Sequence, residues 1–311
     1  MDKYQKPITI SRQSDFFEKW AVWKSEVKAL PKDIESISET DTDYGYTKEF
    51  YFTGVANTKV YGCLFLNKTK DAKKELIVLY HGLGAVIATE GYQQIAKYWL
   101  DEGYSVLGMD SRLQGGKTID PNHYQYREYG LTAFNILDPD NYYSKRLFQD
   151  ALQLLEITES LPEIKSWPIY VTGGSKGGEL SLFSASLSKK VSLCLCDIPS
   201  GCYLEGRIKG AHGSYRELNK FIADHPEREE QVLKTVSYFD LANFASQIAC
   251  PVLASVGSED LICPPDFFYQ AYRQIPSPKV FIEYAGYGHG GYDSIHMAKK
   301  FVFIEIYRVK E

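Results

Sequence analysis

A serine within a glycine-rich turn is the residue of this sequence best suited to nucleophilic chemistry. Ser175 stands at the centre of the segment GGSKG at 173–177, which matches the pattern G-x-S-x-G. An apolar, strand-like run at 169–172 precedes it and a helix-like segment follows, which is the context that the pattern requires. A plain glycine-rich turn that caps a helix is the alternative, but the spacings of phosphate- and dinucleotide-binding loops are absent. We predict that Ser175 is a nucleophile, raised on a sharp turn that its flanking glycines permit.

A serine hydroxyl becomes an effective nucleophile when a base removes its proton and a carboxylate orients that base. In chains with this kind of serine turn, the acid and then the histidine follow the serine, each after a late strand. His289 stands on the glycine-flanked loop AGYGHG at 285–290, directly after the strand-like run 280–284. The other histidines lie in less suitable places, so we predict that His289 is the base.

The acid is one of two adjacent carboxylates. Glu259 and Asp260 both follow the strand-like run 252–256, and either side chain could reach the histidine. We favour Asp260, because it lies one residue further past the strand, just before a segment that the prolines at 264–265 stiffen.

Attack on an acyl carbonyl also needs N–H donors for the oxyanion that forms. The usual donors are the amide after the nucleophile and one amide from the loop after an earlier strand. In this sequence those amides belong to Lys176 and Leu83. We expect His81-Gly82 to act structurally, by letting this loop approach Ser175 closely.

The elements that must position these residues alternate between strands and helices, which predicts an α/β fold with a parallel sheet. The expected strands are 47–53, 59–65, 76–80, 105–109, 169–172, 191–196, 252–256 and 280–284, and the expected helices are 92–101, 145–160, one from 176, one after 265, and 292–307. The continuous apolar run at 76–80 indicates a buried central strand. An amphipathic helix at 14–29 precedes them, with Phe16, Phe17, Trp20 and Trp23 as its packing face.

We predict a single domain over residues 1–311, because no repeat or flexible linker divides the chain. Residues 1–45 form an N-terminal extension. Two segments, 113–144 and 198–248, interrupt the alternation and are rich in polar and aromatic residues. Long excursions of this kind commonly cover an active site.

Composition and charge exclude several classes of partner. The chain of 311 residues has a net charge of -5 and no long basic run, so we expect neither nucleic acid nor an anionic membrane as a partner. The start of the sequence lacks a secretory signal and no apolar run is long enough to span a bilayer, which predicts a cytoplasmic protein. Cys194 and Cys196 lie two apart in a strand-like run, so we interpret the cysteines as reduced core thiols. No spacing matches a zinc site, and we predict no metal or cofactor.

From about residue 10 onward, the chain resembles the carbohydrate esterases that include acetyl xylan esterases and cephalosporin C deacetylases. The segment VTGGSKGG at 171–178 is similar to the nucleophile segment of that family, Asp260 with the prolines at 264–265 to its acid loop, and YGH at 287–289 to its histidine loop. The resemblance implies an α/β-hydrolase fold, with helices on both faces of a mostly parallel sheet. It also implies removal of short acyl groups, mainly acetyl, from acetylated oligosaccharides or similar alcohols through an acyl-enzyme intermediate, without a cofactor.

Four positions depart from the family pattern. Leu83 stands where the family usually has Tyr, Leu113 where it has Gly, Lys176 where it has Gln, and Gly290 where it has Glu. Leu83 and Lys176 still supply backbone N–H groups, so we expect the departures to change the substrate more than the reaction. They also favour one rival hypothesis, a binding protein that keeps the fold without activity, while a peptidase or thioesterase on the same fold is another.

The resemblance further implies a homo-oligomer, with the excursion at 113–144 near the contact. The aromatic side chains of that excursion, Tyr124, Tyr126, Tyr129 and Phe134, suit a subunit interface, and they suit packing within the chain equally well.

Overall fold

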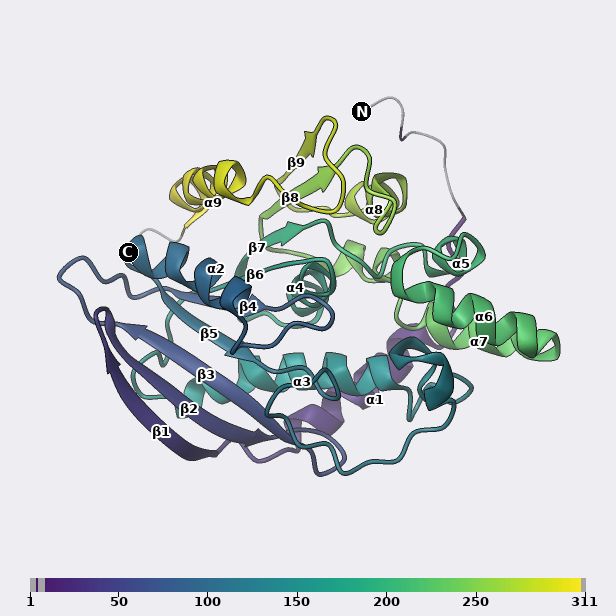
Figure 1. Ribbon diagram of the computed structural model, residues 1–311, viewed down its shortest axis with the longest axis horizontal. Coiled ribbons are helices and arrows are strands. Elements are labelled where there is room, and N and C mark those ends of the chain that lie inside the picture. The colour runs from purple at the N-terminus through teal and green to yellow at the C-terminus, as the bar shows by residue number, and fades with distance from the viewer. Residues whose placement is uncertain (1–3, 5–8, 309–311) are drawn as a thin grey trace.

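The computed structural model describes residues 4 and 9–308, and Figure 1 shows a twisted sheet with helices on both sides. Within these described residues the sheet has nine strands, in the order β1-β2-β3-β5-β4-β6-β7-β8-β9. The strands are β1 (Ile34–Thr42), β2 (Gly45–Thr53), β3 (Lys59–Asn67), β4 (Leu76–Tyr80), β5 (Ser105–Met109), β6 (Ile169–Gly174), β7 (Val191–Asp197), β8 (Val252–Gly257) and β9 (Lys279–Tyr284). Pairing is antiparallel from β1 to β5 and parallel from β5 through β4 to β9. The predicted, mostly parallel α/β sheet is confirmed.

Helices cover both faces of this sheet because the side chains of its central strand alternate between two cores. Ile77 and Leu79 of β4 belong to one core, to which α2 and α9 contribute, and Leu76, Val78 and Tyr80 belong to the larger core on the other side. The helices of the α/β alternation are α2 (Glu90–Asp101), α3 (Tyr143–Ile157), α4 (Lys176–Leu187), α8 (Pro265–Tyr272) and α9 (Asp293–Tyr307). The predicted burial of residues 76–80 is confirmed, since all of β4 is buried.

The parallel part of the sheet positions the candidate site. Parallel strands end at the same edge of a sheet, and ligands bind beyond the carboxyl ends of the strands in folds of this kind. Ser175 directly follows β6, Asp260 follows β8 and His289 follows β9. The loop that begins at His81 follows β4, between β5 and β6 in the sheet.

The two excursions pack against each other. Before α3 begins at Tyr143, the helical segments of the first are short 3-10 turns. The second carries α5 (Leu204–Lys209), α6 (Arg216–Asp224) and α7 (Glu229–Ser237), which Figure 1 shows at one end of the molecule. The rings of Tyr126 and Tyr129 lie 5.0 and 5.1 Å from the ring of Phe221 in α6. The side chains of Tyr126 and Tyr129 therefore pack within the chain, and the subunit interface stays a prediction.

The N-terminal segment differs from the prediction in two respects. Helix α1 (Phe16–Lys28) buries Phe16, Trp20 and Trp23, but Phe17 is 46% exposed and lies outside the packing face. The residues expected to form only an extension also contain β1, which the sequence did not indicate. Most side chains of β1 are polar and exposed, so its sequence has no apolar pattern that would predict a strand. The strand is held by backbone pairing with β2.

The cysteine prediction is confirmed, since all six cysteines are free and buried. Cys194 and Cys196 lie in the same core, as their spacing in a strand requires. Among the described residues, no helix has the length and apolar character needed to cross a membrane. Residues 1–3 and 5–8 of the N-terminal sequence considered above lie outside the described residues.

Candidate active site

Ser175 occupies a strained turn between β6 and α4. Its backbone has φ 58° and ψ -115°, a conformation that a residue with a side chain rarely adopts. A Cβ at Gly177 would lie 2.2 Å from the Tyr80 carbonyl oxygen, and one at Gly173 would lie 2.5 Å from it. The flanking glycines are therefore required by the close approach of β4. The Ser175 amide donates to the Asp197 carbonyl at 3.0 Å, which ties the turn to the end of β7.

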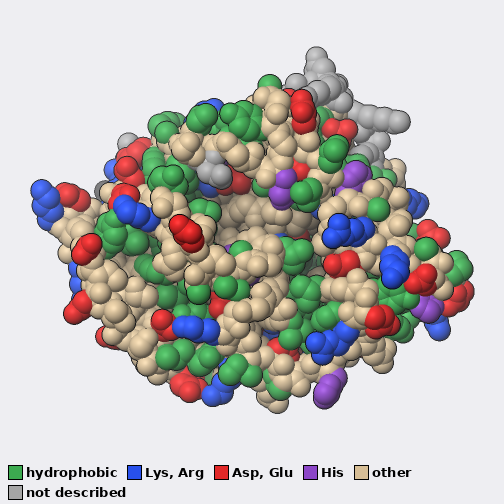
Figure 2. All heavy atoms as spheres, viewed as in Figure 1, with side chains coloured by type: hydrophobic (Ala, Val, Ile, Leu, Met, Phe, Trp, Pro, Cys, Tyr) green, Lys and Arg blue, Asp and Glu red, His purple; other side chains and the backbone are tan. Residues whose placement is uncertain are grey.

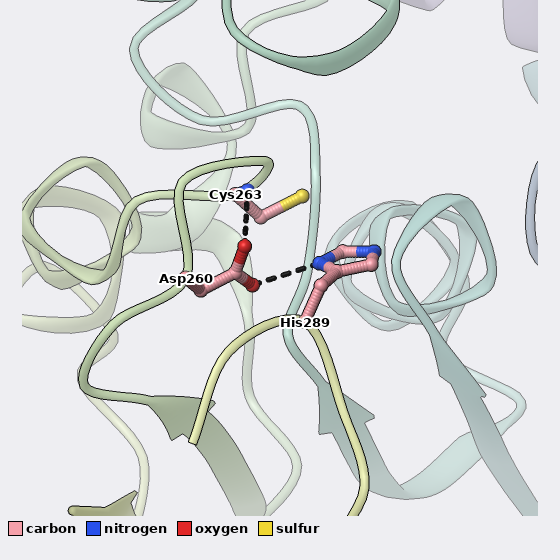
Figure 3. A group of neighbouring side chains, drawn as sticks. All are labelled: Asp260, Cys263 and His289. Atoms are coloured by element: carbon pink, nitrogen blue, oxygen red, sulfur yellow. Dashed lines mark hydrogen bonds and ion pairs between the residues drawn. The ribbon is translucent and has the colours of Figure 1, made fainter. Parts of the chain in front are cut away.

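Asp260 and His289 lie together beyond β8 and β9 (Figure 3). The His289 Nδ1 lies 2.8 Å from Asp260 Oδ2 and donates its proton to that carboxylate. The other carboxylate oxygen of Asp260 accepts the amide protons of Ile262 and Cys263, both at 2.8 Å. Asp260 is 2% exposed, whereas Glu259 is exposed. Of the two carboxylates left open by the sequence, the one in contact with His289 is that of Asp260.

The electrostatics of this pair favour a protonated histidine. Burial lowers the pKa of His289, but the hydrogen bond to Asp260 and the contact with the Cys263 sulfur outweigh it and raise the pKa to about 9. Asp260, Cys263 and His289 also offer one oxygen, one sulfur and one nitrogen within 4.8 Å of one another, which are ligand types that zinc accepts. The hydrogen bonds that Asp260 accepts from His289 Nδ1 and from the Cys263 backbone amide hold the Asp260 and His289 side chains in this arrangement (Figure 3).

The loop after β4 is held by a neutral histidine and a glutamine. The Ser111 amide donates to His81 Nε2 at 2.9 Å, so the ring proton is on Nδ1, which donates to the Gly82 carbonyl at 2.8 Å. Burial lowers the pKa of His81, which favours this neutral form. Gln114 accepts the amide proton of Gly84 at 3.0 Å. These contacts position the loop that carries Leu83, and the expected structural role of His81 agrees with them.

The positions that depart from the family pattern have distinct local structures. The Lys176 ammonium lies 2.6 Å from Glu179 Oε2, and both side chains are buried. Leu113 has φ 60° and Gly290 has φ 103°, both in the left-handed region. Leucine at such a φ costs roughly 1–2 kcal/mol relative to glycine. The glycine expected at position 113 therefore suits the backbone better than the leucine present.

Two supporting residues were not singled out by the sequence. Gln114 bridges the Gly84 amide and the Tyr143 hydroxyl. Arg207, which is 2% exposed in the second excursion, donates to the Ile262 carbonyl at 2.8 Å and so holds the loop of Asp260. No local pattern marks either residue, because each acts on a loop that is distant in the sequence.

A second Asp–His pair lies at the end of β7, the strand next to β6 in the sheet. His296 Nε2 is 2.9 Å from Asp197 Oδ1, and the Lys300 ammonium contacts Asp197 Oδ2. Burial raises the pKa of Asp197, but Lys300 and His296 outweigh it, so the pKa lies below its usual value. The sequence gives only a weak indication of this second pair. Asp197 ends a strand, as a site residue would, and His296 and Lys300 are four apart on one helix face.

Ser175 and His289 open onto one cavity. It has a volume of about 560 Å³ and also takes in Leu83, Ile198 and Gly290. Figure 2 shows the hollow on the face of the molecule that Figure 1 views. Ile198, at the end of β7, has φ 37°, which is unusual for a β-branched residue. This strained backbone places an apolar side chain beside Gly174 and Gly290.

A serine on such a turn, followed by an aspartate and a histidine after the last two strands, defines the class of α/β-hydrolases. The acetyl xylan esterase (AXE1) family matches residues 2–306, so the chain belongs to this family. The chain is 29% identical over 270 residues to the acetyl esterase Axe7A of Xylanibacter ruminicola; the match covers 83% of the chain but only 60% of that protein.

Two solved structures are similar over nearly the full chain. The chain is 30% identical to an acetyl xylan esterase from Paenibacillus sp. R4. The match covers 99% of both chains, with a TM-score of 0.89. It is 26% identical to acetyl xylan esterase 1 from Thermoanaerobacterium sp. JW/SL YS485. This match covers 96% of both chains, with a TM-score of 0.83. The predicted resemblance to acetyl xylan esterases is confirmed.

Proposed function

We propose that this protein is a serine esterase that removes acetyl and other short acyl groups from acetylated sugars or related alcohols. The observation that carries this proposal is the 2.8 Å contact between Asp260 and His289, at a cavity that Ser175 shares with His289. Membership of the acetyl xylan esterase family supports the reaction class.

In the proposed reaction, Ser175 Oγ attacks the acyl carbonyl while His289 Nε2 takes the hydroxyl proton. Asp260 holds the Nδ1 proton and stabilises the imidazolium that forms. The backbone N–H groups of Leu83 and Lys176 donate to the oxyanion. His289 then returns its proton to the leaving alcohol, which leaves an acyl group on Ser175. Water, activated by the same histidine, releases the carboxylic acid and restores the serine.

The role of Ser175 is tested by the Ser175→Ala variant with p-nitrophenyl acetate as substrate. We expect hydrolysis to fall to the background rate, together with an unchanged melting temperature, since the hydroxyl is needed only for chemistry. A phosphonate that labels activated serines should modify the wild-type protein and leave the variant unlabelled. Retention of full activity by the variant would contradict the proposal.

Absence of both turnover and labelling in the wild-type protein would favour the rival hypothesis of an inactive binding protein. A cytoplasmic location and a homo-oligomeric state also remain predictions. The first comes from the sequence and the second from the family resemblance, and light scattering of the purified protein tests the second.

A further inference from the structure

The cavity at Ser175 is longer than an acetyl group. Its lining runs from Ser175 and His289 back along β6 to Thr172, and it also includes Asp197 and His296. Thr172 lies three residues before Ser175, and a strand rises by roughly 3.3 Å per residue, so the inner end is about 10 Å from the serine. An acetyl group on Ser175 is a small part of that length. The volume of about 560 Å³ therefore leaves room for the rest of the ester.

The inner end of the cavity carries a polar nitrogen that makes no hydrogen bond. His296 is 2% exposed, and its Nε2 has no hydrogen-bond partner among the residues that the structure describes. Asp197 Oδ1 lies 2.9 Å from this nitrogen but is not placed to accept its proton, and it already accepts the Ser255 hydroxyl proton at 2.7 Å. A buried polar group without a partner costs free energy. The nitrogen would therefore gain from a polar group of a bound ligand.

His296 and Asp197 offer a donor and an acceptor side by side. The Tyr284 hydroxyl lies 2.9 Å from His296 Nδ1, and the nearby carboxylate favours a proton on Nε2, so Nε2 is a donor. The Asp197 side chain is 14% exposed, and Lys300 holds its other oxygen. A hydroxyl group both accepts and donates. One hydroxyl group can therefore bind His296 Nε2 and the Asp197 carboxylate together.

The other walls of the cavity suit the carbon skeleton of a sugar ring. Leu79, Tyr98 and Met297 give the cavity largely apolar walls. Sites for small molecules commonly combine apolar walls with a few polar groups that fix the orientation of the ligand. A sugar ring has apolar C–H faces and hydroxyl groups at its edge. It therefore matches both the walls and the polar inner end.

We propose that the sugar portion of the acetyl ester enters this cavity, and that one of its hydroxyl groups binds between His296 Nε2 and the Asp197 carboxylate. The acetyl group then lies at Ser175. This inference rests on the proposed function and adds a specificity-determining site to it. The contacts of His296 with Tyr284 and Asp197 hold its ring in place for this role.

The test compares two acetates of ring alcohols, a monoacetylated methyl xyloside, which has free hydroxyl groups, and cyclohexyl acetate, which has none. The quantity measured is the ratio of kcat/KM for the xyloside to kcat/KM for cyclohexyl acetate. The difference in leaving group is the same for every variant, so it cancels when the ratios are compared. His296→Phe keeps an aromatic ring but removes the N–H donor. We expect this variant to lower the ratio by about three- to tenfold, the effect of one hydrogen bond.

Tyr284→Phe is the matched control. It removes the contact between the Tyr284 hydroxyl and His296 Nδ1, which His296→Phe also removes, and it leaves Nε2 in place. Tyr284 is not among the described residues that line the cavity, so the wild-type ratio is expected. His296→Gln restores an N–H donor and should bring the ratio to within about twofold of the wild-type value.

The outcomes separate this inference from the proposed function. A wild-type ratio in a folded His296→Phe variant would overturn the inference, because the site at Nε2 would then hold only water. An equal fall in Tyr284→Phe would overturn it as well, since the effect would come from the position of the ring. His296→Leu replaces the phenylalanine variant if a melting curve shows that the latter does not fold. Absence of hydrolysis with both acetates and with p-nitrophenyl acetate would instead contradict the proposed function.

Discussion

The molecule contains two Asp–His pairs at the same edge of one sheet, and they differ in what surrounds the histidine. In one pair His289 lies 2.8 Å from Asp260, and in the other His296 lies 2.9 Å from Asp197. The side chain of His289 is 23% exposed, whereas that of His296 is 2% exposed. The pairs are nearly alike in separation, so separation alone cannot distinguish a catalytic pair from a structural one.

The two pairs differ in the surroundings of the histidine ring nitrogen that does not face the aspartate. Figure 3 shows the second nitrogen of His289 on the side away from Asp260, and the ring lines the cavity with Ser175. The second nitrogen of His296 is held by the Tyr284 hydroxyl at 2.9 Å, and Asp197 is also engaged by Lys300. Both ring nitrogens of His296 therefore face neighbouring side chains, those of Asp197 and Tyr284. We infer that the first pair serves the reaction and the second holds α9 against the end of β7.

Replacement of each histidine by alanine gives the largest expected difference. His289→Ala should lower kcat by about 10⁴- to 10⁶-fold, because the general base is lost. His296→Ala should lower the free energy of unfolding by about 2–4 kcal/mol, because buried polar contacts are lost, and change kcat by less than about tenfold. Rates with p-nitrophenyl acetate and denaturant titrations measure both effects. A loss of kcat in His296→Ala as large as in His289→Ala would assign the second pair to catalysis.

Replacement of the two neighbouring carboxylates sharpens the assignment of the first pair. Asp260→Asn should lower kcat by about 10⁴-fold, since the amide no longer fixes the tautomer and charge of His289. Glu259→Gln is the matched control and should leave kcat unchanged, because Glu259 is exposed. Steady-state rates of the two variants decide the matter, and the opposite ranking would make Glu259 the acid.

The change of kcat/KM with pH is the smallest of the expected effects on the rate. His289 must be neutral to accept the serine proton, and its pKa is about 9, so kcat/KM should rise with pH through about 9. Between pH 7 and pH 9 the expected rise is roughly 50-fold, from the neutral fraction of one group. A profile of kcat/KM, corrected for spontaneous hydrolysis, tests this, and a midpoint near 6.5 would show that Asp260 does not raise the pKa.

The same pKa fixes the sign of a stability effect. The folded-state pKa of His289, about 9, lies above the ordinary value of 6.5. The contact with Asp260 therefore stabilises the fold fully below about pH 6.5, and this contribution is lost as the pH rises through about 9. Denaturant titrations at pH 6 and pH 10 should detect the loss, and it should be absent in Asp260→Asn.

Much of the sheet could be predicted because its central strands have local signatures. The continuous apolar run of β4 and the alternation of strands with helices follow from burial on both faces. Strand β1 could not be predicted, since it is held by backbone pairing with β2 and has few apolar side chains. The exposure of Phe17 also depends on the exact orientation of α1, which tertiary packing decides.

The sequence by itself determined the candidate nucleophile and base. Ser175 is marked by the glycines of its turn, and His289 by a glycine-flanked loop after a late strand, and both signals are local. Tertiary structure decided which carboxylate meets the histidine, because Glu259 and Asp260 are neighbours whose environments differ only after folding. It also decided the pairing of Asp197 with His296 and the size of the cavity, since both arise where segments distant in the chain pack together.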